Sequence, residues 1–241
     1  MCEILAVAAP EDIAFDTVLP WARDLEHLGV AGFGWGVAWL VEDGVRRYRN
    51  AGSLRNDRDG ARSAGPVVSS RFLVHLRRPN RLSTVQLADS QPFLDAPTEE
   101  GVGQFAFCHN GFLQRHAELR PRYRARLRGR ADSEVGFELL RERLAAGSDA
   151  AMSLAEVHER LGGTANLGYL GEEGKLLVYG GNPANRLWQF ESDGLTVAAT
   201  ALHSDDDSLF DLLFTDATNR RGIGPVVVRL DAGVGAARRA V

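Results

Sequence analysis

The spacing of apolar positions predicts a mixed first half and a second half dominated by strands. Residues 3–8 alternate weakly between apolar and polar positions and predict a short buried strand. Apolar residues at helical spacing predict a helix over 14–28. Two apolar segments, 37–41 and 45–48, flank a Glu-Asp-Gly turn and predict a β-hairpin.

The middle of the chain predicts two more strands and two helices. Segments 67–76 and 105–108 are short and apolar, as buried strands are. Residues 51–66 are rich in Gly, Asp, Arg and Ser, and we interpret them as a surface loop. The expected helices cover 133–146, with Asp132 as N-cap, and 153–161, with Ser153 as N-cap.

The last third of the chain consists of short apolar segments separated by turn signals. The expected strands are 164–170, 175–180, 186–191, 195–201 and 225–230. We find no internal repeat and no linker that would divide the chain, which predicts one domain. Many strands with few helices between them predict an α+β fold in which stacked antiparallel sheets are flanked by helices.

Composition and charge exclude several classes of protein. The chain has 241 residues, of which 44% are hydrophobic and 25% charged, as in ordinary globular domains. A formal net charge of −4 provides no general basic field, so we expect no nucleic-acid partner. No apolar segment reaches the roughly 18 to 20 residues that cross a bilayer, and the N-terminus lacks the features of a signal peptide. We therefore expect no membrane association.

The cysteines have to be explained one at a time, because there are only Cys2 and Cys108. Two cysteines do not build a disulfide framework, and a reducing cytoplasm is the expected location. Cys108 lies in an apolar segment and is interpreted as an inert core residue. No CxxC, HExxH or paired-histidine spacing occurs, so we expect no metal site and no cofactor.

Cys2 has chemistry that depends on its position. A small second residue allows an aminopeptidase to remove Met1, which leaves a thiol and a free α-amine on one residue. That amine has a pKa of about 8, so it can take the thiol proton and later return it to a leaving amine. The alternative is that Cys2 is only a small hydrophobic residue at the start of a strand.

Three further segments carry candidate chemistry. Asn110 and Gly111, at the end of the expected strand, can donate a side-chain and a backbone N–H to an oxyanion, although an Asn-Gly pair is also an ordinary turn. Arg77 follows a strand and can bind a carboxylate with two hydrogen bonds, or form a surface ion pair. Asp132 is a helix N-cap that could also hold an ammonium group.

The order of these segments resembles a known family. The motifs are Cys2, Gly34-Trp35-Gly36, His75-Leu76-Arg77, Gln91-Pro92-Phe93, His109-Asn110-Gly111 and Asp132-Ser133-Glu134. In this order they are similar to those of the class II glutamine amidotransferases. The short chain with a β-rich second half resembles the stand-alone branch, which includes the γ-glutamyl-amide hydrolase of ergothioneine synthesis. The resemblance is strongest from residue 2 to about residue 140.

The resemblance implies a fold and a role for each motif. The fold would be the four-layer αββα sandwich of the N-terminal-nucleophile hydrolases, formed by a single domain over residues 2–241. Cys2 would be the nucleophile, its α-amine the proton shuttle, and Asn110 with Gly111 the oxyanion hole. Arg77 would bind the α-carboxylate of the substrate and Asp132 its α-ammonium group. His109 and Trp35 are further candidates for the substrate pocket. A buried, hydrogen-bonded histidine explains His109 as well, and for Trp35 core packing is the first interpretation and a wall of the pocket the second.

Three functions are compatible with this pattern. The first is hydrolysis of the γ-amide of glutamine through a Cys2 γ-glutamyl thioester, with the ammonia passed to a separate synthetase partner. The second is hydrolysis of a larger γ-glutamyl amide, and the third is a catalytically silent regulatory or binding subunit. Arginine recurs at alternate positions over 120–130, which we interpret as a solvated basic loop; the alternatives are a docking patch for an acidic partner or a lid over the site.

Overall fold

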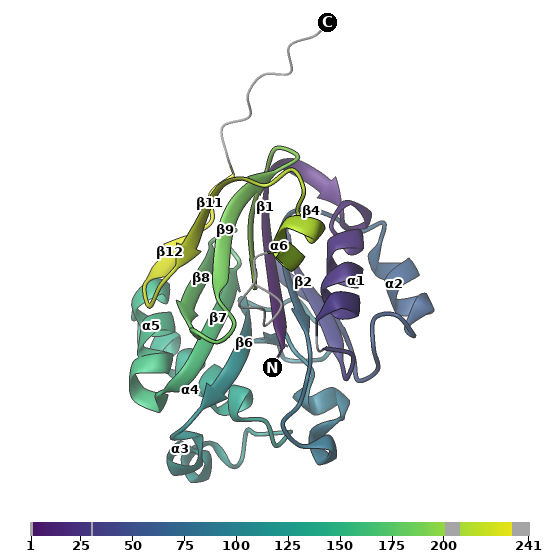
Figure 1. Cartoon of the computed structure of the whole chain (residues 1–241). Helices are drawn as coiled ribbons and strands as arrows, with labels where there is room; N and C mark the ends of the chain where they lie inside the picture. The colour runs from purple at the N-terminus through teal and green to yellow at the C-terminus, as the bar shows by residue number, and fades with distance from the viewer. Residues whose placement is uncertain (1, 30, 201–207, 233–241) are drawn as a thin grey trace, which may run out of the picture.

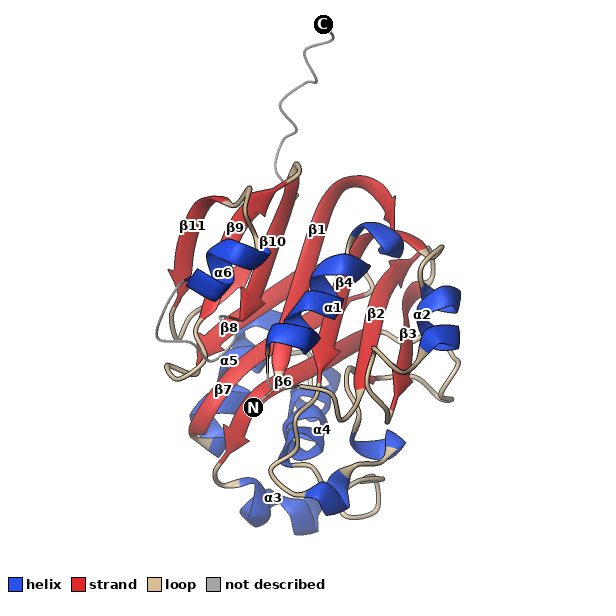
Figure 2. Cartoon of the chain, turned by 45° about the vertical axis from the view of Figure 1, so that its right-hand side comes forward, coloured by secondary structure: helices blue, strands red, loops and turns tan. Residues whose placement is uncertain are grey.

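Two stacked antiparallel sheets with helices on both outer faces form the molecule (Figures 1 and 2). This is a computed structural model in which residues 2–29, 31–200 and 208–232 are described. The expected α+β fold with a four-layer αββα arrangement is confirmed.

Within the described residues, the first sheet has seven strands and the second has five. The strand order of the first sheet is β11 (Thr218–Ile223), β9 (Leu187–Ser192), β10 (Leu195–Thr200), β1 (Glu3–Ala14), β4 (Val68–Leu76), β2 (Trp35–Val41) and β3 (Gly44–Asn50). The order of the second is β12 (Val227–Arg229), β8 (Leu176–Gly181), β7 (Gly163–Gly171), β6 (Phe105–Leu113) and β5 (Phe93–Leu94).

Helices cover the outer face of each sheet. The first sheet is covered by α1 (Leu19–Leu28), α2 (Arg58–Ala64) and α6 (Ser208–Leu213). The second is covered by α4 (Asp132–Ala145) and α5 (Ala150–Leu161), and α3 (His116–Tyr123) packs against α4. Among the described residues, no helix is both long and apolar enough to cross a membrane.

The central strand β1 shows why the chain forms layers. Leu5 and Val7 point toward the helices on the outer face, whereas Ile4 and Ala6 point toward the second sheet. Successive side chains of a strand point to opposite faces, so a strand that is apolar at every position must be covered on both sides. The weak alternation of residues 3–8 results from this double burial.

Two expectations about the first half were wrong. The helix expected over 14–28 begins only at Leu19, because β1 continues to Ala14 and a 3-10 turn, Phe15–Thr17, follows it. The expected loop 51–66 contains α2, whose N-cap Asp57 accepts a hydrogen bond from the Gly60 N–H at 3.1 Å. The buried face of α2 consists of Gly60 and alanines, so no periodic pattern of large apolar residues marks it.

Both expected helix caps also differ. Helix α5 begins at Ala150, and Asp149 caps it by accepting hydrogen bonds from the N–H groups of Ala151 and Met152. The N-cap of α4 is Ala131, and Asp132 is the first helical residue. The Asp132 carboxylate instead accepts a hydrogen bond of 2.7 Å from the Leu113 N–H on β6.

The segment 109–111 lies within a strand and forms neither a strand end nor a turn. β6 runs from Phe105 to Leu113, and Asn110 pairs with Asn166 on β7. β6 pairs with β7 along its whole length, and this pairing keeps residues 109–111 extended. The expected strand ended at residue 108 because the apolar segment ends there.

Candidate active site

Cys2 lies beside Arg77 because of the register of the first sheet. Glu3 pairs with Leu76 across β1 and β4, so the residue before β1 faces the residues after β4. The Cys2 Sγ atom lies 3.3 Å from the Arg78 backbone nitrogen and 3.5 Å from the Arg78 carbonyl oxygen. Residues separated by more than seventy positions therefore share one end of the sheet.

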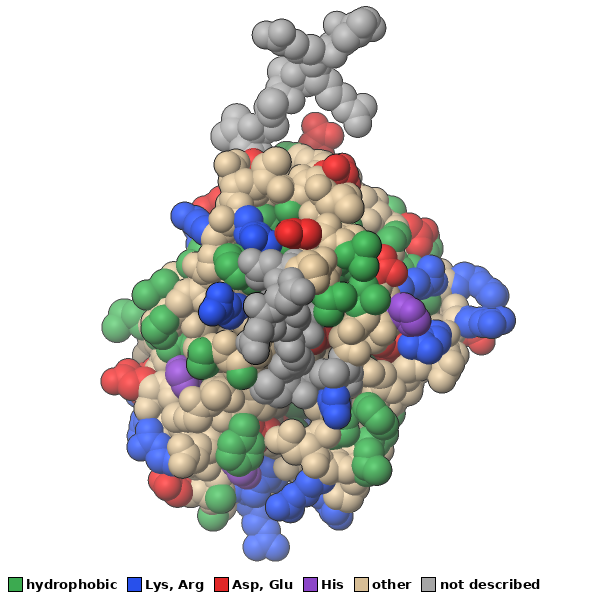
Figure 3. Space-filling model, viewed as in Figure 1, with side chains coloured by type: hydrophobic (Ala, Val, Ile, Leu, Met, Phe, Trp, Pro, Cys, Tyr) green, Lys and Arg blue, Asp and Glu red, His purple; other side chains and the backbone are tan. Residues whose placement is uncertain are grey.

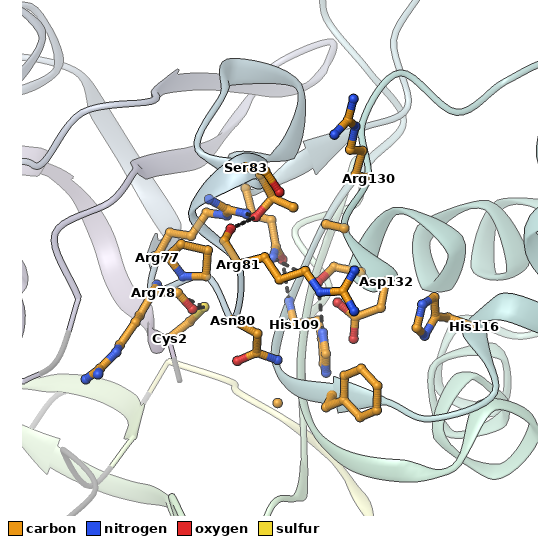
Figure 4. A pocket seen from close by; sticks show the side chains of 17 residues that line it. Cys2, Arg77, Arg78, Asn80, Arg81, Ser83, His109, His116, Arg130 and Asp132 are labelled. Atoms are coloured by element: carbon orange, nitrogen blue, oxygen red, sulfur yellow. Dashed lines mark hydrogen bonds between the residues drawn. The ribbon is translucent and has the colours of Figure 1, made fainter.

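A cavity of about 280 Å³ opens at this end of the molecule (Figure 4). Five of the residues expected from the sequence line it: Cys2, Arg77, His109, Gly111 and Asp132. The described residues thus bring a thiol, a guanidinium, a carboxylate and a glycine N–H to one space.

Burial of Cys2 favours the protonated form of its thiol. Burial raises the pKa of this thiol, and the Arg78 backbone N–H and the Arg77 guanidinium oppose the effect without cancelling it. Because a protonated thiol is a weak nucleophile, this cysteine needs a base to react.

Arg77 is 4% exposed and its charge is not balanced by any carboxylate in the described part of the chain. Its guanidinium donates hydrogen bonds to the Thr84 hydroxyl at 2.8 Å and to the Phe33 carbonyl at 3.5 Å. Burial lowers the pKa of Arg77, and Cys2, Asp89 and Asp132 oppose this. A buried guanidinium without an anionic partner can bind a carboxylate from a ligand at little further cost of desolvation.

Asp132 supplies the opposite charge on the other side of the cavity. One of its oxygens accepts the Leu113 N–H, and no cation in the described residues forms an ion pair with it. Two opposite charges that face one cavity, each without an ionic partner, are complementary to a zwitterion.

Gly111 lines the cavity and requires its lack of a side chain. Its φ of +141° is unfavourable for other residues, and a Cβ atom built there would lie 2.0 Å from the Thr164 carbonyl oxygen. Asn110, which precedes it, is completely buried and does not line the cavity. Its Nδ2 atom donates a hydrogen bond to the backbone carbonyl of Cys2.

His109 is held by a chain of hydrogen bonds that the sequence did not reveal. Its backbone N–H donates to Gln91 Oε1 at 2.6 Å, which leaves the Gln91 amide nitrogen to donate to the Ser133 hydroxyl at 3.1 Å. The Ser133 hydroxyl in turn donates to His109 Nδ1 at 2.9 Å, and the protonated Nε2 faces the Thr164 carbonyl. Burial lowers the pKa of His109, so a neutral imidazole forms part of the cavity wall.

Trp35 lies outside the cavity that contains Cys2. It is completely buried in the core between the first sheet and its helices, and its indole N–H donates to Asp57 at 2.9 Å. It does not line this cavity, so the structure favours core packing over a role in the substrate pocket.

Known proteins resemble this chain in sequence family and in fold. Residues 1–206 match the family model described as glutamine amidotransferases class-II. The chain belongs to this family. A search of curated protein sequences finds no significant match.

Solved structures of class-II glutamine amidotransferases and related proteins share the fold. The glutamine phosphoribosylpyrophosphate amidotransferase of B. subtilis superposes with a TM-score of 0.70 and 16% identity, over 97% of this chain and 50% of that one. This chain therefore spans half the length of that enzyme. A predicted glutamine amidotransferase from Pseudomonas aeruginosa superposes with a TM-score of 0.55 and 19% identity, over 98% of this chain and 100% of that one. A glutamine aminotransferase class-II domain protein from Silicibacter pomeroyi superposes with a TM-score of 0.58 and 17% identity, over 96% of this chain and 99% of that one.

The arginine-rich segment of this protein is more ordered than a solvated loop. Arg120, in α3, donates to the carbonyl groups of Gly129, Arg130 and Ala131. Three of the other alternate arginines are paired with carboxylates; the pairs are Arg122–Glu142, Arg126–Glu138 and Arg128–Glu99. Basic side chains gather at the lower end of the molecule in Figure 3, where Figure 1 places α3. The Arg120 contacts hold the backbone that leads into Asp132.

Glu3 and His75 are buried titratable groups near the site, and their protonation equilibria change the stability with pH in opposite directions. Burial raises the pKa of Glu3 to about 7, although hydrogen bonds from Thr200 and Asn185 oppose it. Burial lowers the pKa of His75 to about 3, and the nearby Arg77 charge adds to this. Both groups are thus neutral when folded over part of the pH range in which they are charged when unfolded.

Glu3→Gln is expected to change how stability depends on pH. Between about pH 4.5 and 7 the folded protein keeps a proton on Glu3 that the unfolded chain releases, so the free energy of unfolding falls as the pH rises. His75 has the opposite sign, because its stabilisation is lost as the pH falls toward 3. Glu3→Gln removes only the first effect. The free energy of unfolding of the variant minus that of wild type should therefore increase by on the order of 3 kcal/mol from about pH 4.5 to about pH 8. Urea unfolding of both proteins at the two pH values measures this, and a difference that does not vary with pH contradicts it.

Proposed function

We propose that this protein hydrolyses the γ-amide of glutamine, or of a γ-glutamyl compound, through a thioester on Cys2. The observation that supports this most is the position of two unpaired opposite charges, Arg77 and Asp132, in the same cavity as the thiol. An α-amino acid head group has one carboxylate and one ammonium group, and these two side chains match them. The family membership agrees with this chemistry.

The proposed reaction begins after Met1 has been removed. The Cys2 α-amine, with a pKa of about 8, takes the thiol proton while the sulfur attacks the amide carbon. The Gly111 N–H and the Asn110 amide stabilise the negative oxygen of the tetrahedral intermediate. The ammonium form of the Cys2 amine then protonates the leaving amine as the C–N bond breaks. Water hydrolyses the thioester, which releases glutamate and restores the thiol.

The leaving group can be ammonia or a larger amine. The cavity is lined by Arg81, His116 and Phe112 as well as by the residues proposed to bind the head group. The ratio of kcat/KM for glutamine to that for larger γ-glutamyl amides distinguishes the two substrates. If glutamine is preferred, we propose that the ammonia goes to a separate synthetase partner.

Covalent labelling tests the proposal directly. A diazo ketone analogue of glutamine is expected to add once to the protein, on Cys2, and intact mass will show that the labelled chain lacks Met1. Arg77→Gln should slow labelling on the order of 100-fold at low concentrations of the analogue, because the analogue's carboxylate loses its partner. Arg124→Gln is the matched control, since Arg124 is exposed and forms no ion pair among the described residues.

Two results would contradict the proposal. One is a processed protein, free of Met1, that does not react with the analogue; this would favour a catalytically silent subunit. The other is an Arg77→Gln variant that is labelled as fast as the Arg124→Gln control.

A further inference from the structure

Three asparagines form a buried cluster behind Cys2. Asn110 lies on β6, Asn166 is its cross-strand partner on β7, and Asn182 directly follows β8. All three are almost completely buried. Buried amides in a sheet interior are costly unless their hydrogen bonds are satisfied, so their partners indicate what the cluster does.

The orientation of Asn166 is determined by backbone groups alone. Its Nδ2 atom donates to the Asn185 carbonyl at 2.6 Å, and its Oδ1 atom accepts the Asn182 backbone N–H at 3.2 Å. A carbonyl can only accept and a backbone N–H can only donate, so the Asn166 amide cannot be turned over. Its Nδ2 atom must therefore face Asn110.

Asn110 is oriented in turn by its neighbours. Its Oδ1 atom accepts hydrogen bonds from Asn166 Nδ2 at 3.1 Å and from Asn182 Nδ2 at 3.0 Å. Its Nδ2 atom then points toward the Cys2 carbonyl. If the Asn110 amide turned over, its NH₂ group would face two other NH₂ groups and its oxygen would face a carbonyl oxygen.

We propose that Asn166 and Asn182 are positioning residues that keep the Asn110 NH₂ group directed at Cys2. The proposal rests on the proposed function, in which this NH₂ group donates to the oxyanion. One hydrogen of the Asn110 NH₂ group faces the Cys2 carbonyl, and in the proposed function the other donates to the negative oxygen that forms beside the thiol. A reversed amide would present an oxygen to that charge, so the cluster acts only through Asn110 and affects the chemical step.

Asn182→Asp tests the positioning role. It replaces the NH₂ group that donates to Asn110 by a carboxyl group, which can donate a hydrogen bond only when it is protonated. The ionised carboxylate of this variant cannot donate to Asn110 Oδ1, whereas the protonated carboxyl group can, and burial raises the pKa of such a carboxyl. At about pH 9 we expect kcat to fall about 100-fold with KM within about twofold of wild type. The ratio of variant to wild-type kcat should rise at least about tenfold as the pH is lowered to about 6.

Two further variants separate positioning from a general structural effect. Asn182→Ala removes one donor without adding a charge, so its kcat should be about tenfold lower with a ratio to wild type that does not vary with pH. It also serves as the test if Asn182→Asp does not fold. Asn56→Asp adds the same charge at an exposed position and should match wild type throughout. Wild-type kcat in both Asn182 variants, or a loss confined to KM, would overturn the proposal.

An NMR measurement separates this proposal from the proposed function. The side-chain NH₂ resonances of Asn110, assigned by their loss in Asn110→Ala, should shift in Asn182→Asp at high pH and return toward wild type at low pH. Asn56→Asp should leave them unchanged. If wild type hydrolyses no γ-glutamyl amide, the proposed function fails, and these resonances alone decide the positioning role. Resonances unaffected by Asn182→Asp would overturn it.

Discussion

Cys2→Ala should lower kcat for hydrolysis of a γ-glutamyl amide by on the order of 10⁴-fold or more. The thiol is the nucleophile in the proposed reaction, and its loss leaves water to attack the amide without covalent catalysis. The other cysteine cannot replace it, because Cys108 is completely buried between the sheets and burial raises the pKa of its thiol. Arg77 and Asp132 remain in place, so KM should change little.

The measurement is ammonia or amine release under single-turnover and steady-state conditions. Cys108→Ala is the matched control, since it also removes one thiol but leaves the cavity intact, and its kcat should stay within about threefold of wild type. Far-UV circular dichroism of both variants shows whether they are folded. A folded Cys2→Ala protein with a turnover within about tenfold of wild type would rule out the thioester mechanism.

Gly111→Ala should lower the free energy of unfolding by on the order of 4 kcal/mol. The added methyl group would approach the Thr164 carbonyl oxygen to 2.0 Å, and that oxygen belongs to the backbone of the neighbouring strand. The positive φ adds a second cost, because alanine rarely adopts it. Any shift of β6 that relieves the contact moves the N–H expected to donate to the oxyanion, so kcat should fall as well.

Gly194→Ala provides the comparison for this prediction. Gly194 also has a positive φ, of 76°, but nothing lies within 4 Å of the position of its Cβ atom. Its cost should therefore be only that of the backbone conformation, about 1 kcal/mol. Urea unfolding of both variants gives the two values. Equal costs would show that the contact with Thr164 is relieved without strain.

Large apolar residues at regular spacing made some elements predictable. The β2–β3 hairpin and the strands β4, β7, β8, β9 and β10 lie close to where their patterns place them. Helix α2 was missed because its buried face has only small residues, and β11 was missed because Thr218–Arg221 is polar and exposed. Neither segment has a hydrophobic face large enough to produce a recognisable period.

The candidate site was predictable where a motif carries its own chemistry. Cys2, Arg77, His109, Gly111 and Asp132 could be named from residue type and order, and the structure places all five around one cavity. Trp35 was interpreted first as core packing and second as a pocket wall, and it lies in the core. Glu3 and Asn182 carry no motif, so only their hydrogen-bond partners reveal them.

The sequence by itself determined the layered fold and the chemical groups of the candidate site, since both depend on local pattern and residue type. The tertiary structure alone decided that Cys2 contacts the Arg78 backbone, that Asp132 accepts a hydrogen bond from β6 and does not cap its helix, and that the Asn110 amide points toward Cys2. The physical reason is strand register. Cys2 and Asn110 are 108 positions apart. Cys2 directly precedes a strand of the first sheet and Asn110 lies in the second sheet, so their contact depends on how the strands pair and how the sheets stack. The same register places the thiol of Cys2 in one cavity with the opposite charges of Arg77 and Asp132.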